Sequence, residues 1–122
     1  MHLQPPDDAD TLVQLLTPQG TRVEHPTFRN LLSADGLRAC YRDLVLVRRL
    51  DTEAVALQRQ GEIGLWASLL GQEAAQVGSA RALAPQDFAF PTYREHGVTW
   101  CRGVDTVDLL GLFRGVNQGS NN

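Results

Sequence analysis

The segment LRACYRDLVLVRRLDTEAVAL, residues 37–57, determines the fold class of this 122-residue chain. Apolar residues recur in it at steps of three and four, as they do on one face of an α-helix. These residues are Leu37, Cys40, Tyr41, Leu44, Val47, Leu50, Ala54 and Leu57. Ser33 or Asp35 suits the start of such a helix, and Gly61 suits the position just after its end. We therefore expect one long helix over about residues 35–60.

Three shorter helices should follow it along the chain. They are expected at residues 71–83, 93–101 and 105–114. The middle one depends on a capping box, in which Thr92 is the N-cap and Glu95 reaches back from the first turn. Extended structure is expected only as short pieces near residues 12–24 and 87–90. The predicted fold class is therefore mostly α.

The first 33 residues differ from the rest of the chain. Pro5, Pro6 and the aspartates that follow make a polar opening, which is typical of loosely held chain. We expect residues 1–33 to form a partly disordered N-terminal arm that packs on its own or a neighbouring subunit. Residues 34–119 should form the folded part, and residues 120–122 a frayed tail.

Composition excludes several classes of function. The chain has 11 basic and 14 acidic residues, a net charge of −3, which is not the basic footprint of a nucleic-acid-binding protein. No apolar run approaches the roughly 20 residues that span a bilayer, and the N-terminus has no signal-peptide pattern. Two cysteines are too few for a disulfide framework, as in a reducing compartment. We expect a cytoplasmic protein without nucleic-acid or membrane partners.

Arg94 is the residue whose predicted place is least favourable. The capping box puts Tyr93 and Arg94 in a first helical turn, where free N–H groups and the helix dipole already present positive charge. An anionic ligand would resolve this conflict, because a helix N-terminus with an arginine fork is a phosphate site. The alternative is an arginine that extends into solvent or pairs with a local carboxylate.

Other candidate residues have a structural explanation as an alternative to a functional one. His96 is a possible general acid or phosphate ligand, but it has no visible partner, and a structural histidine is the alternative. Trp66 and Trp100 are more typical of a core than of a cofactor platform. Cys40 and Cys101 lack metal-ligand spacing and read as small buried hydrophobes. No dinucleotide, P-loop or zinc-protease motif is present.

Several short motifs occur in one order and spacing. They are Gln60-Gly61-Glu62-Ile63-Gly64-Leu65, Gly71-Gln72-Glu73-Ala74-Ala75, Ala82-Leu83, Asp87 and Tyr93-Arg94-Glu95-His96-Gly97, preceded by Tyr41-Arg42 and Arg48-Arg49-Leu50-Asp51. From about Leu37 to about Gly119 the chain resembles the N-terminal part of the α subunit of thiamine-diphosphate-dependent 2-oxo acid dehydrogenases. These are the decarboxylating components of the pyruvate and branched-chain complexes. The resemblance implies the N-terminal helical segment of an α/β thiamine-diphosphate-binding fold, incomplete at its C-terminal side.

The resemblance also implies a cofactor and partners. In that family thiamine diphosphate and Mg²⁺ lie between the α and β subunits of an α2β2 heterotetramer. A Tyr-Arg pair, carried here by Tyr93 and Arg94, reaches the diphosphate. The expected partners are a β subunit, a second α subunit and a lipoyl-bearing acyltransferase component. The implied reaction is oxidative decarboxylation of a 2-oxo acid, with transfer of the acyl group to lipoyl.

Two departures from the family pattern limit what this chain can do. The Gly-Asp-Gly metal motif with its downstream Asn, and the loop with a catalytic His, do not occur. We therefore expect no catalytic residue and no metal ligand on this chain, and no activity from it alone. Ala67 replaces the His of pyruvate-type members, and apolar Leu65 and Trp66 beside it suggest a substrate pocket of the branched-chain kind. The rival hypothesis is a helical subunit-interaction module that binds no cofactor.

Overall fold

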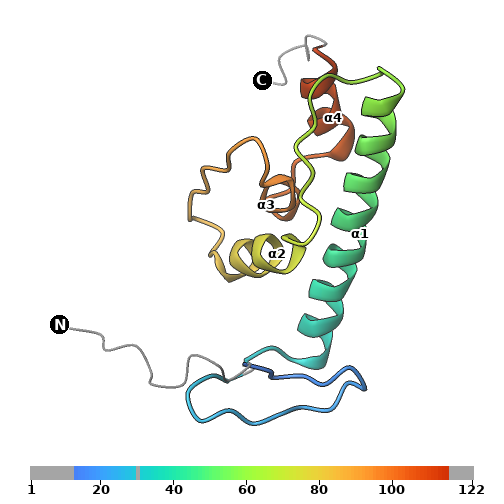
Figure 1. The fold of residues 1–122 in the computed structure, drawn as a ribbon. Coiled ribbons are helices and arrows are strands. Elements are labelled where there is room, and N and C mark those ends of the chain that lie inside the picture. The colour runs from blue at the N-terminus through green and yellow to red at the C-terminus, as the bar shows by residue number, and fades with distance from the viewer. Residues whose placement is uncertain (1–12, 30, 116–122) are drawn as a thin grey trace, which may run out of the picture. The chain divides into compact units, whose positions relative to one another are not determined.

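The structure, a computed structural model, describes residues 13–29 and 31–115. It contains two units, residues 1–33 and residues 34–122. The described part of the second unit holds helices α1 (Ala34–Arg59), α2 (Glu73–Ala82), α3 (His96–Cys101) and α4 (Thr106–Arg114) (Figure 1). No strand occurs within residues 13–29 or 31–115. The prediction of a mostly α fold is confirmed.

Helix α1 has the length that the apolar periodicity predicts, and its end is chemically defined. Gly61 has φ +75°, a conformation that costs glycine little because it has no Cβ. The Gly61 N–H donates to the carbonyl of Gln58 at 3.0 Å, and the Glu62 N–H donates to that of Leu57 at 2.9 Å. These two bonds make a Schellman motif. The predicted end of the helix at Gly61 is therefore confirmed.

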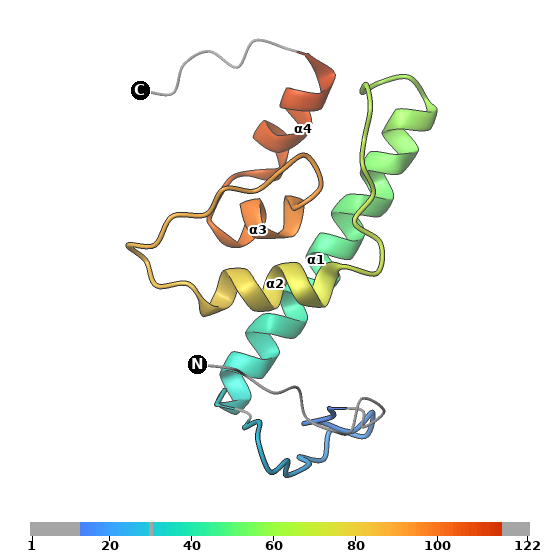
Figure 2. The ribbon, with the colours of Figure 1, turned by 60° about the vertical axis from the view of Figure 1, so that its left-hand side comes forward.

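The core lies along one face of α1, where α2 crosses it and α3 packs against both helices (Figures 1 and 2). Two clusters of buried apolar side chains make up this core. The first contains Leu50, Ala54, Ile63, Trp66 and Leu109, and the second contains Val47, Leu69 and Val77. Tyr41, which the periodicity places on the apolar face, is largely exposed. The apolar face of α1 is thus covered only in part by the described residues.

Two predictions for the segment between α2 and α3 are wrong. Residues 87–90 form no strand, because a strand needs a hydrogen-bonded neighbour and the described residues supply none there. Helix α3 begins at His96 and not at residue 93. Among the described residues, no helix combines the length and the apolar character needed to cross a lipid bilayer.

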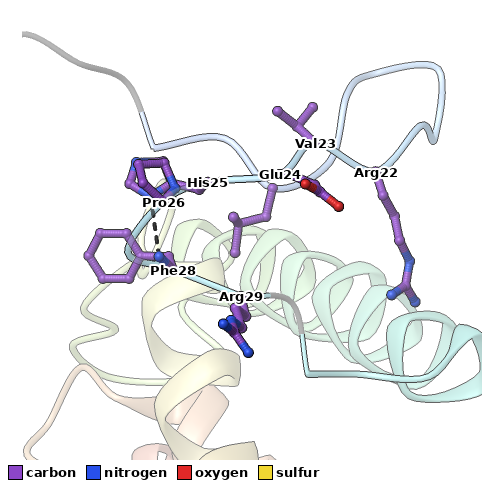
Figure 3. Close-up of a pocket in the computed structure, with 8 residues that line it drawn as sticks. Arg22, Val23, Glu24, His25, Pro26, Phe28 and Arg29 are labelled. Carbon is purple, nitrogen blue, oxygen red and sulfur yellow. Dashed lines mark hydrogen bonds between the residues drawn. The ribbon is translucent and has the colours of Figure 1, made fainter.

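The described part of the first unit contains one antiparallel bridge, between Leu16 and Arg22, around a turn in which Gly20 has φ +82°. Farther along, the Nδ1 atom of His25 accepts the N–H of Thr27 at 3.1 Å. It also accepts the N–H of Phe28 at 3.2 Å (Figure 3). The prediction of short extended pieces near residues 12–24 is confirmed only as this single bridge. The predicted disorder at the start of the arm and the frayed tail at residues 120–122 lie outside the described residues.

Candidate functional site

Tyr93 and Arg94 lie in the connection that loops out from α2 and returns to α3 (Figure 1). The Tyr93 side chain is 67% exposed, while Arg94 is partly buried. The guanidinium carbon of Arg94 lies 5.6 Å from the centroid of the Tyr93 ring, within the range of a cation–π contact. The chain therefore presents a phenol and a cation side by side.

The predicted capping box forms only in part. Glu95 does reach back, because its carboxylate accepts the N–H of Thr92 at 2.6 Å and the hydroxyl of Thr92 at 2.5 Å. These bonds lower the pKa of Glu95. However, the Thr92 hydroxyl donates to Glu95 and caps no N–H, so Glu95 itself takes the N-cap position of α3. Arg94 therefore precedes the helix, and the expected conflict with the helix dipole does not arise.

The guanidinium of Arg94 has a partner that neither sequence alternative named. It donates to the backbone carbonyl of Ser68 at 2.6 Å. Ser68 lies 26 positions earlier, in the connection between α1 and α2. The Arg94 side chain therefore neither extends freely into solvent nor pairs with a carboxylate, but bridges two connections of the fold.

Gln76 on α2 holds the backbone on either side of the α3 start. Its Nε2 donates to the carbonyl of Arg94 at 3.3 Å, and its Oε1 accepts the N–H of Gly97 at 2.9 Å. The Gln76 side chain is buried. A Cβ on Gly97 would lie 3.0 Å from the Gln76 Oε1 and 3.1 Å from its Cβ. Glycine at position 97 therefore permits this close approach of α3 to α2.

Asp51 on α1 holds the connection that contains Ser68. One carboxylate oxygen accepts the indole N–H of Trp66 at 2.9 Å and the backbone N–H of Leu69 at 3.0 Å. The other accepts the hydroxyl of Ser68 at 2.7 Å. Asp51 is buried, and a buried carboxylate is tolerated where its oxygens are hydrogen-bonded. One side chain thus fixes the residue whose carbonyl accepts the Arg94 guanidinium.

Leu65 and Trp66, the predicted substrate-pocket residues, differ in their surroundings. Trp66 is 4% exposed and belongs to the core, whereas Leu65 is 79% exposed. The Trp66 ring stacks on His96 with 3.9 Å between centroids and meets Phe113 edge-on at 4.9 Å. The reading of Trp66 as a core residue is confirmed. A pocket role for the pair stays a prediction.

The surroundings of His96 favour a structural role for it. It is buried, and its Nε2 lies 3.2 Å from the carbonyl of Ala67, which can only accept a hydrogen bond. Burial lowers the pKa of His96, against a smaller opposing effect of that bond. The imidazole packs against Trp66 and Phe113 and is 2% exposed, as expected of a structural histidine. Cys101 is half-buried, and partial burial raises the pKa of its thiol, which favours a structural role for it.

Four buried polar residues organise this region, and the sequence motifs predict a role in the site for none of them. They are Asp43, Asp51, Glu73 and Gln76. A signal exists for two of them, because Asp43 and Asp51 flank Val47 at steps of four on the apolar face of α1. Glu73 pairs with Arg48 and accepts the N–H of Gly71 at 2.9 Å. Asp51 and Glu73 thus hold neighbouring backbone, whereas Asp43 accepts from the side chains of Arg81 and Trp100.

The Tyr93–Arg94 pair fits a diphosphate group. A guanidinium carries five N–H donors in a planar fork, and the bond to Ser68 uses one of its nitrogens. Phosphate oxygens accept such donors strongly, and the exposed Tyr93 hydroxyl adds another donor. Within the described residues, no group of three or more His, Cys, Asp or Glu side chains is placed to hold a metal ion.

The described residues thus form a helical segment that presents the exposed Tyr93 beside Arg94, whose guanidinium is bonded to Ser68. A sequence profile of the family described as "Dehydrogenase E1 component" matches residues 41–122. The chain belongs to this family, which confirms the resemblance that the motifs indicate.

Three relatives illustrate the similarity. The chain is 44% identical over 107 residues to the "3-methyl-2-oxobutanoate dehydrogenase subunit alpha" of Mycobacterium tuberculosis, covering 88% of this chain and 29% of that protein. It is 39% identical over 108 residues to the "Pyruvate dehydrogenase E1 component subunit alpha" of Bacillus cereus, covering 88% and 29%. A protein of the same name from Acholeplasma laidlawii is 35% identical over 102 residues, covering 84% and 30%. The chain spans less than a third of the length of these curated relatives. No solved structure matches it.

Proposed function

We propose that this chain is part of the α subunit of a thiamine-diphosphate-dependent 2-oxo acid dehydrogenase, and that Tyr93 and Arg94 contact the cofactor's diphosphate. The observation that carries the proposal is the exposed Tyr93 beside an Arg94 that the Ser68 carbonyl and the Gln76 amide hold in place. Thiamine diphosphate, when bound, supplies the carbanion stabilisation that decarboxylation of a 2-oxo acid requires. The role of this chain is to bind and orient that group.

Arg94 and Tyr93 contribute differently to such a site. The guanidinium offers charge-assisted hydrogen bonds, each worth about 1.5–3 kcal/mol where a charged group takes part. The Tyr93 hydroxyl offers one neutral donor, which is worth roughly 1 kcal/mol. Of the two residues, Arg94 therefore supplies more of the affinity for the diphosphate, and Tyr93 restricts its orientation.

Tyr93 and Arg94 are the only cofactor contacts that we propose on the described residues. We place Mg²⁺ and the rest of the cofactor contacts on other parts of the subunit and on a β subunit. A second α subunit and a lipoyl-bearing acyltransferase component complete the assembly. The thiols of Cys40 and Cys101 are free, which supports a reducing cytoplasm as the compartment.

A branched-chain 2-oxo acid is the first candidate substrate. The name of the M. tuberculosis relative supports 3-methyl-2-oxobutanoate, and the exposed apolar side chain of Leu65 agrees with a branched substrate. Pyruvate is the second candidate, because the B. cereus and A. laidlawii relatives are named for it.

The test is carbon dioxide release by the subunit that contains this chain, purified together with its β subunit. We expect cofactor-dependent decarboxylation, faster with 3-methyl-2-oxobutanoate than with pyruvate, and none from the 122-residue chain alone. A pair of subunits that assembles but neither binds thiamine diphosphate nor decarboxylates any 2-oxo acid would contradict the proposal. It would favour the rival reading, an interaction module, which the exposed small residues of α2 also suit. These are Ala74, Ala75, Gly78, Ser79 and Ala82.

A further inference from the structure

We infer that Gln76 is a positioning residue for Arg94. Its buried side-chain amide fixes the backbone turn from which the Arg94 guanidinium reaches the diphosphate. The inference rests on the proposed function, since it assigns Gln76 a role only if Arg94 binds the cofactor.

The geometry places one amide against both sides of the turn. Gln76 Nε2 donates to the Arg94 carbonyl at 3.3 Å, and Gln76 Oε1 accepts the Gly97 N–H at 2.9 Å. A second Nε2 bond, at 3.2 Å to the Oε1 of Gln72, fixes which end of the amide faces which partner. Gln76 is 4% exposed, so water cannot easily replace these bonds.

Only a carboxamide supplies both bonds at this position. A carboxylate of the same length accepts from Gly97 but cannot donate to the Arg94 carbonyl. An apolar side chain of similar volume does neither. It leaves the buried Gly97 N–H without its Gln76 acceptor, which is costly, and it leaves the Arg94 carbonyl, among the described residues, with the His96 N–H at 2.9 Å as its donor. The side chain at position 76 therefore determines whether α2 bonds to the turn at one end, at both ends or at neither.

The other end of Arg94 is held from α1. The Ser68 carbonyl accepts the guanidinium, and Asp51 holds the Ser68 hydroxyl. With its backbone fixed by Gln76 and one guanidinium nitrogen bonded to Ser68, Arg94 keeps further N–H donors for a phosphate oxygen. The surrounding turn need not rearrange, and such preorganisation lowers the entropic cost of binding.

The test compares Gln76→Leu with Val77→Ala in the complete subunit paired with its β subunit. Val77 is the neighbouring buried residue on α2 and packs with Val47 and Leu69, so its truncation loosens the same helix without touching Arg94. The measurements are the melting temperature of the apo protein and the Kd of thiamine diphosphate with Mg²⁺ by calorimetry. We expect Gln76→Leu to weaken binding about tenfold, by analogy with outer residues that hold metal ligands. Val77→Ala should lower the melting temperature and leave the Kd within about twofold.

Gln76→Glu keeps the inference testable if the leucine variant does not fold. The carboxylate that this substitution introduces lacks the donor for the Arg94 carbonyl, and protonation of that carboxylate restores it. The ratio of the Kd of this variant to that of the unaltered protein should therefore fall as the pH is lowered from about 8 to about 5.5. The ratio cancels the titration of the cofactor's own phosphate.

Three results separate the possible failures. An unchanged Kd in Gln76→Leu, or equal weakening by Gln76→Leu and Val77→Ala, would overturn the positioning role. A Kd ratio of Gln76→Glu that does not vary with pH would overturn it as well. If Arg94→Ala, measured alongside, leaves the Kd unchanged, then the proposed function itself fails.

Discussion

Gly97 of α3 lies close against Gln76 of α2, which makes it sensitive to any added side chain. An alanine Cβ there would press on the Cβ of Gln76 at 3.1 Å, an atom that cannot move without its helix. We expect Gly97→Ala to lower the free energy of unfolding by about 1–2 kcal/mol, the usual range for an overpacked site. Chemical denaturation measures it.

Gly78→Ala is the matched control for this substitution. Gly78 lies inside α2, and a Cβ there meets nothing within 4 Å. Alanine should therefore raise the free energy of unfolding by about 0.5–1 kcal/mol through helix propensity alone. Equal effects of the two substitutions would contradict the close packing of α3 on α2.

His96 gives the fold a predictable dependence on pH. Burial lowers its pKa in the folded state, whereas in the unfolded chain it titrates near about 6.5. The unfolded state therefore binds more protons, and the free energy of unfolding should fall as the pH drops below about 6.5. Denaturation at pH values of about 7.5, 6.5 and 5.5 should show this loss, with a shallower slope in His96→Gln. Identical slopes in the two proteins would show that His96 is not held neutral.

At the scale of elements, Asp51 joins α1 to the connection that leads into α2. Asp51→Ala removes the only acceptor that the described residues offer to the Trp66 indole, and it also releases Ser68 and Leu69. Unpaired buried donors cost about 1–3 kcal/mol each, and the Trp66 and Leu69 donors are buried, so we expect at least about 2 kcal/mol of lost stability. Asp35→Ala is the control, because Asp35 and its partner Arg38 are both largely exposed. A comparable loss in both variants would argue against a special role for Asp51.

Local signals in the sequence predict most of the helices but not the turn before α3. Asp105 accepts the N–H of Val107 at 2.7 Å, as its place before α4 predicts, and Gly61 ends α1 as expected. The predicted start of α3 is wrong because the Thr92 hydroxyl donates to Glu95 and caps no helix N–H. No local sequence rule distinguishes this pair from a full capping box. The bond from Gln76 to Gly97 spans 21 positions, and no local pattern reveals it.

In the candidate site too, local sequence signals identify the residues but not the contacts between distant parts of the chain. The sequence singles out Tyr93 and Arg94, and the structure does place them side by side. The physical reason given for Arg94, a cation in a first helical turn, is wrong, because the residue precedes α3. Its actual partner, the Ser68 carbonyl, depends on how the connections of the fold meet.

At the scale of the whole molecule, several large apolar side chains have no cover among the described residues. Phe88 is 86% exposed, and Phe90 is 90% exposed. Such surface marks interfaces or aggregation sites when it is contiguous. The 122-residue chain should therefore bind a hydrophobic dye, and the assembled pair of subunits should not. Replacing both Phe88 and Phe90 by Ser should reduce dye fluorescence while the helical circular dichroism stays the same. Undiminished fluorescence would show that other surfaces bind the dye.

The most direct test of the central claim is the affinity of the complete subunit pair for thiamine diphosphate with Mg²⁺ before and after Arg94→Ala. Loss of a charge-assisted contact of about 1.5–3 kcal/mol should raise the Kd roughly ten- to a hundredfold, and Tyr93→Phe should raise it less. Arg38→Ala, an exposed arginine of α1, should leave the Kd unchanged. The apo melting temperature should fall only slightly in Arg94→Ala, because one hydrogen bond to Ser68 is lost. A lower melting temperature with an unchanged Kd would contradict the claim and leave Arg94 a purely structural bridge.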